Sequence, residues 1–337
     1  MMLSIVLPAF NAEKTIYELL KSILAQSFQD WELIVIDDGS TDKTFEILKE
    51  FSKIESRITV ITQENKGYRS VRNTGLEVAK GEYVTFIDSD DRLLPNFFES
   101  ALMELELFRV EMLITGYNII NEDGKKIKEI KYSSLLSENV FDEVGSRLIG
   151  SAPSLSDSIM PVVWSNFYST SIIKENFVRF QESTEIVSED LYFNLEYLKY
   201  IERIKVSEII GYEYRIHNNS ITQLEDREKI FLQLAMINLL TKQISPFFTN
   251  QVELKKRLEL NFLISLRSEL FTRYASENFI GILKRHKKIL NNLDVRKILT
   301  WTPIKEFSVK RKIFVIIVKM RLYLITSLIT LFRTIFL

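Results

Sequence analysis

The sequence has no cysteine, only two histidines, and no apolar stretch of the roughly 20 residues that a membrane span requires. Without cysteine, disulfides, thiolate zinc sites and cysteine nucleophiles are excluded, and a reducing compartment is favoured. The 44 basic and 45 acidic residues leave a net charge of −1, which disfavours a nucleic-acid binder that relies on bulk positive charge. The first ten residues lack the charged-then-apolar pattern of a secretory signal. We therefore expect a cytoplasmic protein that binds no nucleic acid.

What is present is an ordinary globular composition, 46% hydrophobic and 26% charged over 337 residues. This length allows one large domain with an appendage, or two domains. Over the first 120 residues, short apolar runs alternate with helix-period segments. The predicted elements are strand 3–7, helix 16–24, strand 33–36, helix 45–51, strand 58–61, helix 70–79 and strand 83–87. Such alternation predicts a mostly parallel sheet covered by helices on both faces.

Polar residues follow each of the four predicted strands. They are Asn11, Asp37 and Asp38, Asn65 and Gly67, and the acidic run 88–91. Ligands of open α/β sheets bind beyond the carboxyl ends of the strands. The four strand ends therefore predict one shared crevice.

Beyond residue 112 the pattern changes to strands and loops, with a hairpin turn predicted at Asp123-Gly124. Helical periodicity returns at 190–200, and 226–292 is predicted to be helical without a convergent polar cluster.

The segment Asp88-Ser89-Asp90-Asp91 is the most informative in the chain. Like charges concentrated at the end of a buried strand destabilise the fold unless a cation or hydrogen-bond donors balance them. Mg²⁺ and Mn²⁺ take carboxylate oxygens together with substrate phosphates. The alternative is that these acids complement the dipole of a helix starting near Pro95. Their position opposite Asp37 and Asp38 favours a metal.

The run 37–42 also has a structural interpretation, namely a turn and a helix cap with Ser40 or Thr41 as the N-cap residue. That interpretation accounts for Gly39, Ser40 and Thr41. It accounts poorly for two acids at the end of a strand.

Taken in order, several motifs resemble the nucleotide-binding half of the family 2 glycosyltransferases, which have the GT-A fold. The motifs are Pro8-Ala9-Phe10-Asn11, Asp37-Asp38-Gly39-Ser40-Thr41-Asp42, Asn65-Lys66-Gly67, Arg72-Asn73-Thr74-Gly75, Gly81-Glu82-Tyr83 and Asp88-Ser89-Asp90-Asp91. Segments resembling that family's acceptor half are 164–168, 188–191 and 214–222. The resemblance covers about residues 3 to 222. It implies a catalytic domain at 1–225, divided into halves at 1–120 and 121–225, and a helical region at 226–337.

The resemblance also implies roles for individual residues. Pro8 and Phe10 would pack around the nucleotide base, and Asp38 would accept a hydrogen bond from uracil, which favours a UDP-sugar donor. Arg72 would lie near the diphosphate, and Asp88 would contact ribose or sugar. The remaining members of the implied donor site are Asn11, Gly67 and Ser89.

For the chemistry, the resemblance implies a single displacement that inverts the anomeric configuration. Asp190 would be the catalytic base, with Glu189 beside it. Asp90 would bind Mn²⁺ or Mg²⁺, and His217 would reach the metal or the diphosphate. The acceptor would be a hydroxyl group of a glycan or a lipid-linked sugar, and the chain could form homo-oligomers.

The sequence departs from the usual family pattern at several positions, which leaves donor identity and processivity open. These positions are Tyr68, Arg69, Val71, Asn166 and Ser188. Two rival functions remain to be weighed. A non-catalytic sugar-nucleotide or glycan-binding scaffold would have little use for a base such as Asp190. A nucleotidyltransferase would carry a glycine-rich loop after the first strand, and 8–13 contains no glycine.

The C-terminal part of the chain suggests contact with a membrane surface. The run 284–288 is basic, so its His286 is expected on the surface. Residues 307–337 are apolar and interrupted by cations, which predicts a basic amphipathic helix with a polar stripe at Lys312, Lys319, Thr326, Ser327, Thr330 and Arg333. Such a helix either lies on the inner face of the cell membrane or packs on the catalytic domain or another subunit.

Overall fold

The computed structural model describes residues 2–151, 157–183, 186–217, 229–272, 274, 277–301, 307 and 309–333. The chain divides into two compact units. The first consists of 1–143, 161–183 and 188–222, and the second of 144–160, 184–187 and 223–337. The domain boundary predicted at residue 225 lies outside the described residues. Residues 144–160, expected in the first domain, belong to the second unit.

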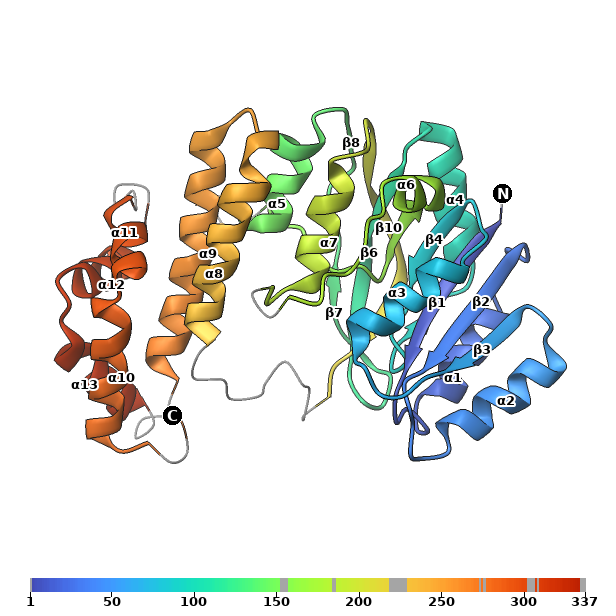
Figure 1. Cartoon of the computed structure of the whole chain (residues 1–337), viewed down its shortest axis with the longest axis horizontal. Coiled ribbons are helices and arrows are strands. Elements are labelled where there is room, and N and C mark those ends of the chain that lie inside the picture. The colour runs from blue at the N-terminus through green and yellow to red at the C-terminus, as the bar shows by residue number, and fades with distance from the viewer. Residues whose placement is uncertain are drawn as a thin grey trace. The chain divides into compact units, whose positions relative to one another are not determined.

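Ten strands form one sheet in the described part of the first unit, in the order β3-β2-β1-β4-β9-β6-β10-β5, with β7 paired to β6 and β8 paired to β10 (Figure 1). The strands are β1 (Leu3–Ala9), β2 (Trp31–Asp37), β3 (Ile58–Thr62), β4 (Tyr83–Phe86), β5 (Arg92–Leu93), β6 (Met112–Ile120), β7 (Lys126–Ile130), β8 (Leu135–Ser137), β9 (Asn166–Ser169) and β10 (Ile204–Arg215). The helices of this unit are α1 (Ile16–Leu24), α2 (Thr44–Ile54), α3 (Tyr68–Val78), α4 (Phe97–Phe108), α6 (Thr170–Glu175) and α7 (Glu189–Leu198).

Strand direction brings the site together at one edge of the sheet. β1 pairs in parallel with β2 and β4, and β2 pairs in parallel with β3. β9 is antiparallel to both β4 and β6, so β6 runs parallel to β4, and β10 is parallel to β6. The carboxyl ends of β1, β2, β3, β4, β6 and β10 therefore lie along the same edge.

Helix α3 packs unusually close to this sheet. Every residue of β1 is buried, and the buried face of α3 includes Arg72 and Gly75. A Cβ atom at Gly75 would lie 2.3 Å from Cγ1 of Val6. Only glycine allows the helix to approach β1 at this distance.

The sequence-based fold class and the first seven elements are confirmed, with bounds that differ by a few residues. The hairpin turn at Asp123-Gly124 joins β6 to β7, and Gly124 has the positive φ (77°) that favours glycine in such turns. The predicted N-cap was wrong, because α2 begins at Thr44 and Lys43 occupies the cap position.

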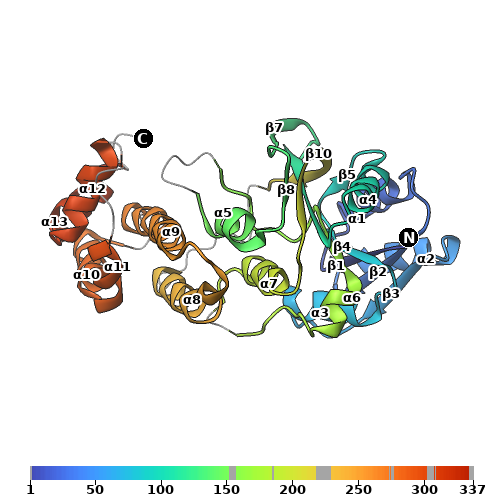
Figure 2. The ribbon, with the colours of Figure 1, turned by 90° about the horizontal axis from the view of Figure 1, so that it is seen from above.

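The second unit is helical, and α9 packs against α8 and α13 (Figure 2). Its helices are α5 (Ser146–Ile149), α8 (Lys229–Gln243), η3 (Ser245–Phe247), α9 (Gln251–Phe271), α10 (Phe279–Asn291), α11 (Leu293–Trp301), α12 (Val309–Lys319) and α13 (Tyr323–Arg333). A π-helical turn, η1 (Val140–Gly145), crosses the boundary between the units. None of the helices in the described residues is both long and apolar enough to span a bilayer.

Two expectations for the C-terminal part were wrong. The predicted single amphipathic helix is two helices, α12 and α13, separated at Arg321, which has a φ of 55°. His286 is fully buried, and its Nδ1 lies 2.9 Å from Thr326 Oγ1 and 3.0 Å from Ser327 Oγ. The basic run around His286 indicated a surface helix, but the helical turn directs this one side chain toward α13.

Candidate functional site

The ends of β1 and β2 are tied together by Asn11. This residue has a φ of 49°, and its Oδ1 accepts a 2.8 Å hydrogen bond from Thr41 N. Its own N–H donates to Ser40 Oγ at 3.0 Å. The two hydroxyl residues expected to cap α2 therefore hold Asn11 instead. Next to it, Pro8 is buried in the strand, whereas the Phe10 side chain is 44% exposed at the strand end.

Asp38 organises the loop that leads into α3. Its Oδ1 accepts hydrogen bonds from Gln63 Nε2 (2.7 Å) and Lys66 N (2.9 Å), and its Oδ2 accepts one from Gly67 N (2.8 Å). A carboxylate offers about four acceptor positions, so one position is left for a ligand donor. The neighbouring Asp37 is also buried, and its Oδ1 has no hydrogen-bond partner in the described structure.

Gly67 precedes α3 with a φ of 81°, a conformation that side chains other than glycine rarely adopt. One turn into this helix, Arg72 joins two carboxylates that are 102 residues apart in sequence. Its Nη1 donates to Asp190 Oδ1 at 2.7 Å, and its Nη2 donates to Asp88 Oδ1 at 3.1 Å. Although burial opposes the charge, these carboxylates raise the pKa of Arg72, so the guanidinium stays positive. The donor side and the base side of the predicted site therefore meet at one arginine.

The three carboxylates of the acidic loop 88–91 differ in how far they are buried. Asp91 is buried and accepts from Tyr212 Oη (2.5 Å) and Arg215 N (2.7 Å). The side chains of Asp88 and Asp90 are 23% and 40% exposed. Strand β5 separates this loop from α4, which begins at Phe97, so the acids do not cap that helix. The structure shows no side-chain cap hydrogen bond at the start of α4, so the helix-dipole interpretation of this motif gains no support.

Arg215, at the end of β10, makes hydrogen bonds to the acidic loop and to two neighbouring segments. Its Nε donates to Asp90 O at 2.9 Å, its Nη1 to Glu122 O at 2.8 Å and its Nη2 to Glu18 Oε2 at 2.6 Å. Sequence reasoning did not select Arg215 or Tyr212, although both precede the predicted His217. The sequence feature that could have identified both residues is the run of polar residues at the end of the strand that precedes His217.

His217 lies beside Asp90. Its Nε2 is 3.1 Å from Asp90 Oδ2, and its Nδ1 is 3.8 Å from Glu122 Oε1. Burial and the nearby Asp88 raise the pKa of Asp90, which indicates a carboxylate short of compensating positive charge. Residues 218–222 of the same motif lie outside the described residues.

The pair formed by Asp90 and His217 fits a divalent cation that takes its other ligands from a substrate. Among the described residues, no three histidine and carboxylate side chains are grouped as a complete metal site. Mg²⁺ characteristically needs only one or two protein carboxylates when substrate phosphates supply further oxygens. The partly exposed Asp90 carboxylate meets that requirement.

Asp190 is placed in the first turn of α7, with 19% of its side chain exposed. Its Oδ2 accepts a 3.2 Å hydrogen bond from Val163 N, while Oδ1 faces Arg72. Burial raises the pKa of Asp190 to about 6, against the lowering effect of Arg72. Such a carboxylate is largely ionised at neutral pH and is still a stronger base than an exposed aspartate. Glu189 points to Arg69, with Oε2 at 3.6 Å from Nη2.

An aromatic cluster supports this edge of the sheet. Trp164 stacks against Tyr212 (ring centroids 4.7 Å apart) and Tyr214 (5.1 Å), and Tyr117 meets it edge-on at 4.8 Å. Trp164 is buried and lies one residue beyond Val163, whose N–H donates to Asp190. It therefore has a supporting role in the site.

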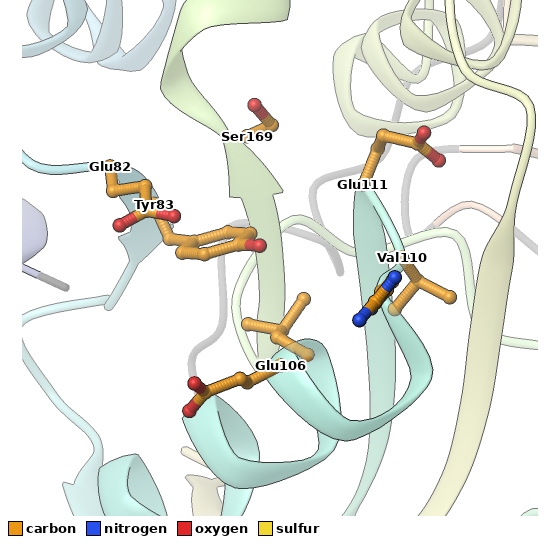
Figure 3. Close-up of a pocket in the computed structure, with 8 residues that line it drawn as sticks. Glu82, Tyr83, Glu106, Val110, Glu111 and Ser169 are labelled. Carbon is orange, nitrogen blue, oxygen red and sulfur yellow. The ribbon is translucent and has the colours of Figure 1, made fainter.

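An open cavity of about 640 Å³ lies at the other edge of the sheet (Figure 3). Its lining comes from the residues before β4, the end of α4 and the start of β6, and includes Glu82, Tyr83, Glu106, Glu111 and Ser169. It contains none of the predicted site residues. The site is defined by strand ends and not by this cavity.

Comparison with known proteins agrees with the geometry. Residues 4–150 match the family model described as Glycosyl transferase family 2. The glycosyltransferase GlyA of Streptococcus pneumoniae serotype 4 is 26% identical over 261 residues, which cover 76% of this chain and 36% of GlyA. The chain thus spans little more than a third of that relative's length.

Two solved structures share the fold. The crystal structure of S. aureus TarS 1-349 in complex with UDP-GlcNAc has a TM-score of 0.69 at 20% identity, covering 98% of this chain and 90% of that one. The mannosyltransferase PcManGT from Pyrobaculum calidifontis, in complex with GDP-Man and Mn²⁺, has a TM-score of 0.54 at 14% identity, covering 97% and 86%. The family match over residues 4–150, the relative and the shared fold agree with the strand-end geometry, and together they support a family 2 glycosyltransferase with a GT-A-like fold.

Proposed function

We propose that this chain is an inverting glycosyltransferase that moves a sugar from a nucleoside diphosphate, with UDP as the favoured nucleotide, to an acceptor hydroxyl. The acceptor is a glycan or a lipid-linked sugar. The observation that carries the proposal is Arg72, which joins the base-side Asp190 to the donor-side Asp88. A sugar transfer needs both sides within reach of one anomeric carbon, and this arginine brings them together.

The reaction is a single displacement. The acceptor oxygen attacks the anomeric carbon, the bond from that carbon to the diphosphate breaks, and the hydroxyl proton passes to the Asp190 carboxylate. Attack on the face opposite the leaving group inverts the anomeric configuration. The raised pKa of Asp190 makes it a better proton acceptor than an exposed aspartate. Arg72 holds its carboxylate in place and keeps it ionised.

Asp90 and His217 are the residues that would hold Mn²⁺ or Mg²⁺. When bound, such an ion neutralises negative charge on the departing diphosphate. The chain's own contribution is to fix the Asp90 main chain through Arg215 and to keep the Asp91 carboxylate turned away from the crevice. The Mn²⁺ complex of PcManGT supports the use of a divalent ion, but not the choice of these residues.

The preference for UDP rests on Asp38 and on the UDP-GlcNAc complex of TarS. Three protein donors already hold the Asp38 carboxylate, so a uracil N–H would take the remaining acceptor position. Phe10, exposed at the end of β1, offers its ring to the base. Pro8 shapes the strand end from within the sheet, and Asn11, Gly67 and Ser89 complete the donor loops.

The first test is thermal unfolding with Mn²⁺ and UDP, compared with GDP, dTDP and CMP. A ligand that binds only the native state at a hundredfold excess over Kd stabilises it by about 2.7 kcal/mol. We expect UDP to stabilise the wild type only with metal, and Asp90→Ala to lose the effect. Stabilisation by another nucleotide alone would overturn the donor assignment.

The second test is release of nucleoside diphosphate from a panel of UDP-sugars with acceptor glycans. Asp190→Asn keeps the shape of the side chain but removes the base, and loss of general-base catalysis lowers kcat by about 10² to 10⁴. UDP binding should survive in this variant. Equal turnover by wild type and Asp190→Asn would contradict the role of Asp190.

The rival function is a non-catalytic scaffold that binds a sugar nucleotide or a glycan. It predicts nucleotide binding without turnover of any UDP-sugar, so the two tests together separate it from the enzyme. We also propose that the catalytic domain spans 1–225, apart from the segment 144–160, which belongs to the second unit. We further propose that the enzyme is cytoplasmic and works at the inner face of the membrane.

A further inference from the structure

Helix α13 has its polar and apolar faces reversed relative to a helix of a water-exposed surface. Thr326, Ser327 and Thr330 are fully buried, and Thr330 Oγ1 donates a 2.6 Å hydrogen bond to Leu270 O of α9. The apolar side chains point outward, with Leu324 54% exposed. The other exposed members of this face are Ile325, Leu328 and Ile329. An aqueous environment favours the opposite arrangement.

The preceding helix, α12, contacts α13 and also exposes apolar side chains. On α12, Val315 and Val318 are buried, whereas Ile313 and Ile316 are exposed, and Met320, one residue beyond the helix, is 64% exposed. Exposed residues at i, i+3 and i+7 lie on one side of a helix. We call the following exposed side chains the apolar ridge: Ile313, Ile316, Met320, Leu324, Ile325, Leu328 and Ile329. Large apolar side chains that gather on a protein surface mark an interaction site.

Cations flank the apolar ridge. A cavity of about 420 Å³ lies between α11 and α12, and its lining includes four basic side chains, Arg296, Lys297, Lys319 and Arg321. A second basic cluster, Lys310, Arg311 and Lys312, stands at the start of α12. Residues 307–337 contain no acid, and 279–337 carry 13 lysines and arginines against two acids.

This charge distribution identifies the partner. The chain as a whole has a net charge of −1, so 279–337 carry about +11 and the remainder about −12. A second copy of the chain would bring the same positive charge to the contact, which opposes self-association. An anionic lipid surface complements both features of this region. Its negative headgroups attract the cations, and its acyl boundary accommodates the apolar ridge.

We propose that α11–α13 form a docking surface for an anionic bilayer, with a lipid phosphate in the basic cavity and the apolar ridge in the acyl boundary. Burial of the threonine and serine hydroxyls against α9 and α10 satisfies the polar side of α13 within the protein. That arrangement leaves its aliphatic side for the lipid. The surface belongs to the second unit and is independent of the nucleotide site.

The test is flotation of the full chain with vesicles of phosphatidylcholine alone or mixed with phosphatidylglycerol. We expect flotation only with anionic vesicles and release at high salt, since the Debye length falls from about 10 Å at 0.1 M to about 3 Å at 1 M. Each cation removed from the cavity should lower the partition coefficient about fivefold. Removing three apolar side chains should lower it by at least about a hundredfold.

Two variants and two matched controls separate these contributions. The ridge variant is Leu324→Gln/Ile325→Gln/Leu328→Gln, and its control changes three exposed apolar residues of the first unit, Ile54→Gln/Met103→Gln/Leu107→Gln. The cavity variant is Arg296→Gln/Arg321→Gln, and its control is Lys125→Gln/Lys128→Gln. All changes are at exposed or cavity-lining positions, and UDP-dependent melting verifies that each variant is folded.

Loss of flotation in both variants but in neither control supports the proposal. Flotation with neutral vesicles, no flotation at all, or unchanged flotation of the ridge variant would overturn it. A ridge variant that changes a dimer into a monomer would assign the surface to a second copy. Inorganic phosphate could also raise the melting temperature of the protein without vesicles. If this increase equals that given by anionic vesicles and is lost in the cavity variant, the cavity binds a soluble phosphate instead of a lipid. Assignment of the surface to a second copy, or of the cavity to a soluble phosphate, would not change the proposed nucleotide site.

Discussion

Replacing Arg72 by methionine should move the acidic limb of the pH–rate profile upward. In the wild type, burial raises the pKa of Asp190 to about 6 while Arg72 opposes the rise. At pH 5 about a tenth of the molecules then carry an ionised base, so kcat/KM should be about a tenth of its plateau. An opposite charge within about 4–6 Å lowers a carboxyl pKa by roughly 1–3 units, and Arg72 Nη1 lies 2.7 Å from Asp190 Oδ1. Without the guanidinium, the limb should therefore move to about pH 7 to 9.

The assay is nucleoside diphosphate release from the UDP-sugar identified by screening, measured over the whole pH range. Arg69→Met is the matched control, because Arg69 stands three residues earlier on the same helix and pairs with Glu189, not with Asp190. Its profile should keep the wild-type limb. Arg72→Lys keeps a charge and should show a smaller shift. An unmoved limb in Arg72→Met, or an equal shift in Arg69→Met, would refute the proposed coupling.

Two further predictions concern stability. Gly75→Ala should destabilise the first unit by about 1–3 kcal/mol, because the new methyl group would overlap Val6 Cγ1; a denaturant titration measures this, and an unchanged midpoint would show that α3 can move away freely. His286 is buried beside Thr326 and Ser327, and burial lowers its pKa from 6.5 to about 3. The folded state therefore binds fewer protons than the unfolded state between these values, so stability is lost as pH falls below 6.5. By pH 5 the loss is about 2 kcal/mol. The difference in unfolding free energy between wild type and His286→Asn should show this slope, and a pH-independent difference would contradict it.

The first part of the sheet, β1 to β4, could be predicted from sequence because the patterns that specify it are local. Apolar runs and helical spacing located β1 to β4 within a few residues, and parallel strands necessarily bring their ends together. That reasoning placed Asn11, Asp38 and the loop 88–91 at one edge, as the structure has them.

Contacts between distant residues could not be predicted in this way. Arg215 and Tyr212 reach the acidic loop from more than 120 residues away, and no local pattern pairs them with Asp91. We expected Ser40 to cap a helix because serine often does so. Its hydroxyl instead accepts a tertiary hydrogen bond from Asn11 N. His286 was misplaced for a similar reason, since neighbouring charges describe the surface of a helix and not the direction of one side chain. Two residues of the buried polar face of α13, Thr326 and Ser327, contact this same histidine.

The close approach of α3 to β1 links packing to chemistry. Gly75 and Arg72 are three residues apart and so lie on the same face of the helix. A side chain at 75 would push this face away from the sheet, and the guanidinium would move with it while Asp88 stayed at the end of β4. The position of Arg72 relative to Asp88 and Asp190 thus depends partly on the absence of a side chain at residue 75, one turn away. Variants at 75 should consequently lose turnover even under conditions in which they remain folded.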